Sequence, residues 1–70
     1  MASQVKVNGV NVFKHVFSNK HVYATRCNHD DIHKLLDKLY SMYNSVVVTN
    51  QEYGFSMLNP NQVYVEITCN

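Results

Sequence analysis

This chain of 70 residues has no tryptophan, one proline, two glycines and two cysteines, and only 16% of its residues are charged. So little proline and glycine exclude collagen-like and low-complexity sequence, which is rich in both. The charged fraction is below the roughly 25% of an average soluble protein, and nine asparagines supply neutral polarity instead. Because a domain needs about 50 residues or more, we expect residues 1–70 to form a single small domain.

Long apolar runs are also missing. A membrane span needs roughly 18 consecutive apolar residues, and the first residues, Met-Ala-Ser-Gln-Val-Lys-Val, do not resemble a secretory signal. We therefore expect a cytoplasmic protein with no membrane contact, located in the host cytoplasm if its source is viral. In a reducing compartment Cys27 and Cys69 are expected to be free thiols rather than a bridge.

The net charge is +1 and the isoelectric point is about 7.8, which excludes both a strongly basic nucleic-acid protein and an acidic mimic of DNA. The charges are nevertheless unevenly distributed. Residues 1–26 carry four basic side chains and no acidic one, whereas residues 39–70 carry only Glu52 and Glu66. We expect the two halves of the chain to present differently charged surfaces.

Asn8-Gly9 is the strongest local signal, because these two residues suit the positive φ angles of a type I′ hairpin turn. The turn joins strands predicted around residues 5–7 and 10–12. Pairing across a two-residue loop places four valines on one face, which we assign to the core. The other face then receives Gln4, Lys6, Asn11 and Phe13.

After the hairpin the sequence predicts a third strand, a helix and three more strands. The second strand extends to about residue 17, a turn occupies 18–20, and a third strand spans 21–26, with His21, Tyr23 and Thr25 predicted on the Phe13 side. Apolar residues at helical spacing predict a helix over 29–43, with Asn28 as its N-cap. Strands are predicted at 46–49, 53–58 and 63–68, with turns at 50–52 and 59–62.

The predicted fold class is α+β. A single helix packs on an antiparallel sheet of five or six strands, in the order β-β-β-α-β-β-β, which gives two layers. Because one helix covers only one face of a sheet, the other face should remain uncovered.

The uncovered face is the candidate binding face, since positive charge and aromatic rings alternate along the strands predicted there. Protein binding is the favoured interpretation, and a single-stranded nucleic acid on the basic, aromatic strands is the alternative. The residues predicted to form this face are Lys6, Phe13, His15, His21, Tyr23 and Tyr64.

Cys27, His29 and His33 form the tightest group of metal-ligating residue types, because the two histidines lie four residues apart on the predicted helix. A zinc-binding domain is therefore a second alternative. A zinc site needs three or four ligands, and no second cluster accompanies this one, so we predict no metal and no other cofactor. A cysteine nucleophile beside a histidine would need an oxyanion-binding element as well, which the sequence lacks; we predict that the protein is not an enzyme.

In its short length, its many asparagines and tyrosines and its lack of a catalytic motif, the chain is similar to accessory proteins of bacteriophages and other mobile elements. This is a resemblance of composition, not of a motif. It implies a module that binds and inhibits a host protein or a defence complex. We also expect self-association into a homodimer or a larger oligomer, since a small sheet leaves edges and a face unpaired.

Overall fold

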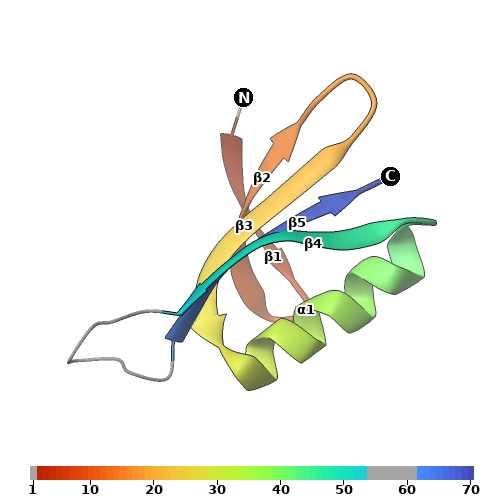
Figure 1. The fold of residues 1–70 in the computed structure, drawn as a ribbon. Coiled ribbons are helices and arrows are strands. Elements are labelled where there is room, and N and C mark those ends of the chain that lie inside the picture. The colour runs from red at the N-terminus through yellow and green to blue at the C-terminus, as the bar shows by residue number, and fades with distance from the viewer. Residues whose placement is uncertain (1, 54–61) are drawn as a thin grey trace.

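The computed structural model describes residues 2–53 and 62–70, which form one antiparallel sheet and one helix. The five strands lie in the order β1-β2-β3-β5-β4, and the helix covers one face of the sheet (Figure 1). The predicted two-layer α+β fold is confirmed. The elements are β1 (Ala2–Val7), β2 (Val10–Val16), β3 (His21–Asn28), α1 (His29–Met42), β4 (Val46–Tyr53) and β5 (Gln62–Cys69).

The strands after the helix differ from the prediction. Residues 50–52, predicted as a turn, belong to β4, so this strand continues to Tyr53. A register shift between Val48 and Asn50 marks a bulge, beyond which β4 keeps pairing with β5. Pairing with a neighbouring strand thus overrides the weak strand preference of asparagine, glutamine and glutamate. The described residues after α1 form two strands instead of three; the rest of the predicted 53–58 strand and most of the 59–62 turn lie outside the described residues.

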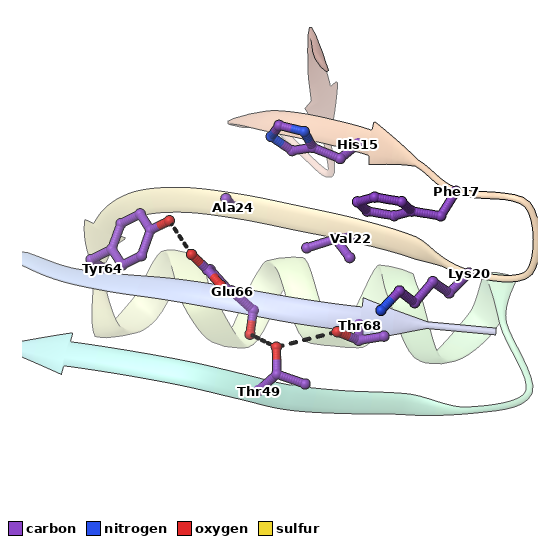
Figure 2. A pocket seen from close by; sticks show the side chains of 9 residues that line it. All are labelled: His15, Phe17, Lys20, Val22, Ala24, Thr49, Tyr64, Glu66 and Thr68. Atoms are coloured by element: carbon purple, nitrogen blue, oxygen red, sulfur yellow. Dashed lines mark hydrogen bonds between the residues drawn. The ribbon is translucent and has the colours of Figure 1, made fainter. Parts of the chain in front are cut away.

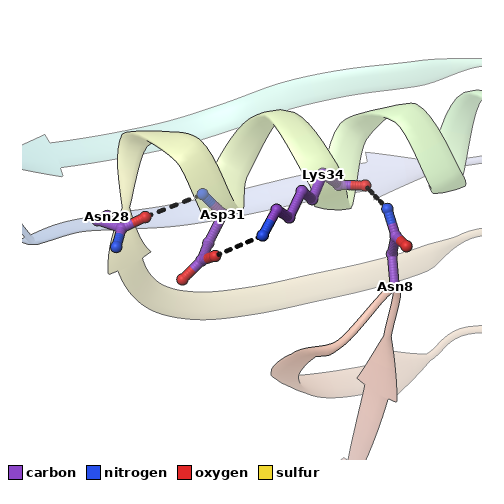
Figure 3. A network of polar contacts seen from close by, with 4 residues as sticks. All are labelled: Asn8, Asn28, Asp31 and Lys34. Atoms are coloured by element: carbon purple, nitrogen blue, oxygen red, sulfur yellow. Dashed lines mark hydrogen bonds and ion pairs between the residues drawn. The ribbon is translucent and has the colours of Figure 1, made fainter.

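The N-terminal hairpin is as predicted. Asn8 and Gly9 have φ angles of 50° and 83°, and Val7 pairs with Val10 across the turn. The side-chain amide of Asn8 also donates a hydrogen bond to the backbone oxygen of Lys34, at 2.9 Å (Figure 3). The hairpin turn is thereby attached to the middle of α1.

Helix α1 begins where the sequence predicts. The Asn28 side chain accepts a hydrogen bond from the backbone N–H of Asp31 at 2.9 Å (Figure 3), and the acidic residues of the first turn complement the positive end of the helix dipole. The helix ends at Met42, one residue before the predicted end, with Tyr43 as its C-cap. No helix within residues 2–53 and 62–70 is long and apolar enough to cross a membrane.

The hydrophobic core lies between α1 and the sheet. Leu35 and Leu39 are fully buried, and the hairpin valines Val7, Val10 and Val12 point toward them from β1 and β2, as predicted. The remaining buried apolar residues come from β3, α1 and β5: Tyr23, Cys27, Ile32, Val63, Val65, Ile67 and Cys69. The opposite face of the sheet carries no described element (Figure 1), and we call it the open face.

Candidate binding face

The prediction for β3 was wrong about which side chains face the helix. Tyr23, with 1% of its surface exposed, and Thr25 are buried on the helix side, whereas Val22 and Ala24 lie on the open face. His21 also belongs to the helix side, because it alternates with Val22. Tyr23 and His21 are therefore not part of the open face.

The physical reason is the length of the loop before β3. A turn at 18–20 would pair Phe17 with His21 and put His21 on the Phe13 side. The structure instead pairs Val16 with His21, and the backbone N–H of Phe17 donates to the Lys20 oxygen at 2.9 Å. A shift of one residue in strand pairing moves every later side chain to the opposite face.

Tyr23 and His21 both pack against Tyr43, the C-cap of α1. The hydroxyl oxygens of Tyr23 and Tyr43 are 2.6 Å apart, and the His21 ring centroid lies 5.2 Å from that of Tyr43. The ammonium of Lys14 sits 5.6 Å from the Tyr23 ring centroid, a cation–π distance. His21 Nδ1 is buried and makes no hydrogen bond within the described part of the chain. This cluster joins the sheet to the helix and has a structural role.

Tyr43 should make the protein less stable at alkaline pH. Burial, followed by the hydrogen bond with Tyr23, raises the pKa of Tyr43 from 10.0 to about 12. The folded state retains the phenol proton at a pH where the unfolded state has lost it. The contribution of the neutral Tyr43 phenol to the free energy of unfolding is therefore complete below pH 10 and is lost as the pH rises through about 12. Urea unfolding across this range should therefore give a falling free energy of unfolding.

Tyr43→Phe is the control for this prediction. Burial also raises the pKa of the Cys27 and Cys69 thiols, so part of the alkaline loss is common to both proteins. The variant should show a shallower loss than the original protein between pH 10 and 12. If the free energy of unfolding fell equally steeply with pH in both proteins, the alkaline loss could not be assigned to Tyr43.

Four of the six predicted binding residues do lie on the open face. Lys6 and Phe13 alternate with the buried valines of the hairpin, and Phe13 is 53% exposed. His15 and Tyr64 are half-buried and line a concavity on this face. The strand pairing brings these residues from β1, β2 and β5 to one side of the sheet.

The concavity has a volume of about 440 Å³ and opens away from the helix (Figure 2). The phenol of Tyr64 donates to Glu66 Oε1 at 2.6 Å. Thr49 donates to the Glu66 backbone oxygen at 3.2 Å and shares a hydrogen bond with Thr68, also at 3.2 Å. The residues that line it are His15, Phe17, Lys20, Val22, Ala24, Thr49, Tyr64, Glu66 and Thr68.

Most of these lining residues were not predicted from the sequence. Glu66 and Thr68 could have been found, because they alternate with Val65 and Ile67 in β5 and therefore share the face of Tyr64. Val22 could not, because its face depends on the pairing between β2 and β3.

Opposite charges share the open face. Glu66 is half-buried in the concavity. The hydrogen bond from Tyr64 to Glu66 is the largest cause that raises the pKa of Tyr64, and burial is the next, so the Tyr64 phenol remains a neutral donor at physiological pH. The ammonium of Lys20 lies 5.3 Å from the Phe17 ring centroid at the rim. The site therefore offers an apolar wall, a cation and a carboxylate within one shallow surface.

No known protein family, curated protein or solved structure matches this chain.

The residues considered for metal binding are separated by the fold. Cys27 is buried beneath the helix, whereas His29 and His33 are exposed on α1. Within residues 2–53 and 62–70, no three histidine, cysteine, aspartate or glutamate side chains come close enough to hold a metal ion. The zinc alternative therefore has no ligand set in the described part of the chain.

Neither cysteine is suited to chemistry as a thiolate. Burial, followed by the nearby carboxylate of Asp31, raises the pKa of Cys27, and burial raises that of Cys69, whereas a reactive cysteine needs a lowered pKa. Strand pairing puts Cys27 opposite Val63 and Cys69 opposite His21. The two cysteines are thus about 20 Å apart along the strands, too far for a bridge, and both are free thiols.

Proposed function

We propose that this protein is a non-enzymatic interaction module that binds another protein molecule through its open face. The observation that carries the proposal is that no described element covers this face, on which Phe13, Phe17 and Val47 are about half exposed. Exposed apolar side chains gathered around a shallow hollow are typical of protein interfaces. The rings supply contact area, and the charged groups around them supply specificity.

Mixed charge on the open face favours a protein over a nucleic acid. Grooves that bind single strands are consistently positive and present rings for base stacking. Here the carboxylate of Glu66 lies inside the concavity, and Glu52 lies on the same face in β4. Phosphates would be repelled by these two groups, whereas a protein surface of mixed charge can complement them.

The proposal includes an inhibitory role. A module without a reaction of its own acts on a partner by occupying one of its surfaces. The compositional similarity to accessory proteins of bacteriophages and mobile elements supports a host protein or a defence complex as that partner, encountered in the host cytoplasm.

Capture of partners by the tagged protein tests the proposal. Phe13→Ala combined with Phe17→Ala removes the exposed rings from the open face, and Tyr40→Ala removes a ring of somewhat greater exposure from the helix as a control. We expect a stoichiometric protein partner that survives nuclease treatment, that is retained by Tyr40→Ala and that is lost with the double variant. A partner that the double variant retains, or one that nuclease removes, would argue against the open face as a protein-binding surface.

A further inference from the structure

Charged side chains on the open face are separated by sign. Lys6 lies on β1, Lys20 in the turn before β3, and Arg26 on β3. The acidic residues lie on the other two strands, Glu66 on β5 and Glu52 on β4. The register places them on the same face, since Arg26 pairs with Tyr64 and Tyr64 pairs with Glu52. One half of the face is therefore basic and the other half acidic.

The exposed apolar side chains of the open face also lie on both halves of the sheet. Phe13 lies on β2 and Phe17 directly after it, whereas Val47 lies on β4. In the sheet order, β2 and β4 are the outer neighbours of the central pair formed by β3 and β5. A rotation that places β2 of one copy over β4 of another would therefore cover the exposed apolar side chains of both strands at once.

A two-fold axis parallel to the strands, located above the gap between β3 and β5, performs this exchange. It stacks two open faces so that β3 of each copy lies over β5 of the other, and β2 lies over β4. Because this axis keeps each residue at its own level along the strands, Arg26 lies over Tyr64 of the partner subunit, with Glu66 of the partner subunit two residues away on the same strand. Phe13 and Phe17 face the strand that carries Val47 of the partner subunit. Oppositely charged halves meet, and exposed apolar groups are covered on both sides.

We infer that the open face also binds a second copy of this chain, in a symmetric face-to-face dimer, so that the second copy and the partner proposed above compete for the same surface. The inference rests on the proposed function, because it needs the open face to be an interface. Its symmetry is that of the commonest oligomers, in which the same patch is used by both subunits. The two sheets would form an aligned sandwich, with one helix on each outer side.

The area of the face sets the expected affinity. Four strands overlap in this arrangement, β2, β3, β5 and β4, whereas β1 lies beyond the edge of the partner's sheet. These strands are 7 or 8 residues long, and at about 4.8 Å between strands and about 3.3 Å per residue they give a footprint of roughly 500 Å² per copy. Stable complexes bury about 800 Å² per partner, whereas weak and transient ones bury less. We therefore expect a reversible dimer whose population depends on concentration.

Charge reversal tests this arrangement by sedimentation velocity of the whole chain over a range of concentrations. A symmetric dimer brings Arg26 of each copy within two residues of Glu66 in the other, so this pair of opposite charges occurs twice. Arg26→Glu alone, or Glu66→Arg alone, sets like charges near each other in both pairs, and we expect dimerisation to weaken by about tenfold or more. Mixing the two variants sets opposite charges near each other in both pairs, so a heterodimer should form.

Lys38→Glu, on the helix and away from the open face, is the control and should dimerise like the original chain. Circular dichroism checks that each variant is folded. Salt supplies a readout that needs no substitution: if ion pairs hold the dimer together, it should weaken as ionic strength rises from about 0.05 M to 1 M, where the screening length falls to about 3 Å.

The rescue in the mixture is the decisive result, because a fold defect in one variant could not produce it. A chain that stays monomeric at every concentration, or variants that dimerise normally alone, would overturn the inference. If the chain is monomeric but Phe13→Ala with Phe17→Ala still loses a captured partner, the proposed function holds and only the second copy is wrong. If the chain is monomeric and that variant loses nothing, both proposals fail.

Discussion

Replacing Tyr23 with alanine should unfold a large fraction of the protein, whereas replacing Phe13 with alanine should barely change its stability. Tyr23 is buried in the core and bonded to Tyr43, and truncating a buried aromatic side chain costs about 3–5 kcal/mol. A chain of 70 residues has a free energy of unfolding of only about 4–10 kcal/mol. Phe13 is half exposed, and substitutions on a surface usually stay within about 0.5 kcal/mol.

Urea unfolding followed by circular dichroism measures both variants. Tyr23→Phe is the matched control: it keeps the ring and removes only the hydroxyl that bonds to Tyr43, so it should cost about 1 kcal/mol. If Phe13→Ala were the more damaging substitution, the faces of β2 and β3 would be the reverse of those described above, and the binding face would have to be reassigned.

Leu39→Ala should have an effect of similar size. The side chain is fully buried where α1 packs against the sheet, and removing a buried leucine from a core costs about 2–5 kcal/mol. The cost is large because the core is small, and few neighbouring side chains can move to fill the cavity.

Leu36→Ala provides a matched comparison for this prediction. It makes the same chemical change in the same helix, so helix propensity contributes equally, but Leu36 is only partly buried beside the core. The loss in free energy of unfolding should therefore be clearly smaller than for Leu39→Ala. Equal losses would show that the helix is not oriented with Leu35 and Leu39 toward the sheet.

The elements determined by neighbouring residues were predictable from the sequence. Asn8-Gly9 suffices for the hairpin because both positive φ angles are local properties of these residues. Asn28 and the spacing of Leu35 and Leu39 suffice for the helix, because its cap and its apolar stripe repeat within a few residues. Lys6 and Phe13 were placed correctly for the same reason, since the two-residue loop sets the register of the hairpin.

The elements that depend on distant pairing were not predictable. Residues 50–52 read as a turn by composition, yet β5 supplies the partner that keeps them in β4 through a bulge. The open-face concavity joins β2, β3, β4 and β5, so its membership depends on a strand order in which β5 lies between β3 and β4. No local pattern specifies that order.

The sequence by itself predicted one helix, which can cover only one face of a sheet, and within residues 2–53 and 62–70 the second face is indeed left uncovered. Only the tertiary structure decided which side chains occupy the bare face. The reason is that strand side chains alternate with a period of two, so the one-residue difference in pairing after the loop at 17–20 buried Tyr23 and brought Val22 and Ala24 to the open face. The uneven charge was visible in the sequence, but its separation into a basic and an acidic half of one surface arises from the strand order.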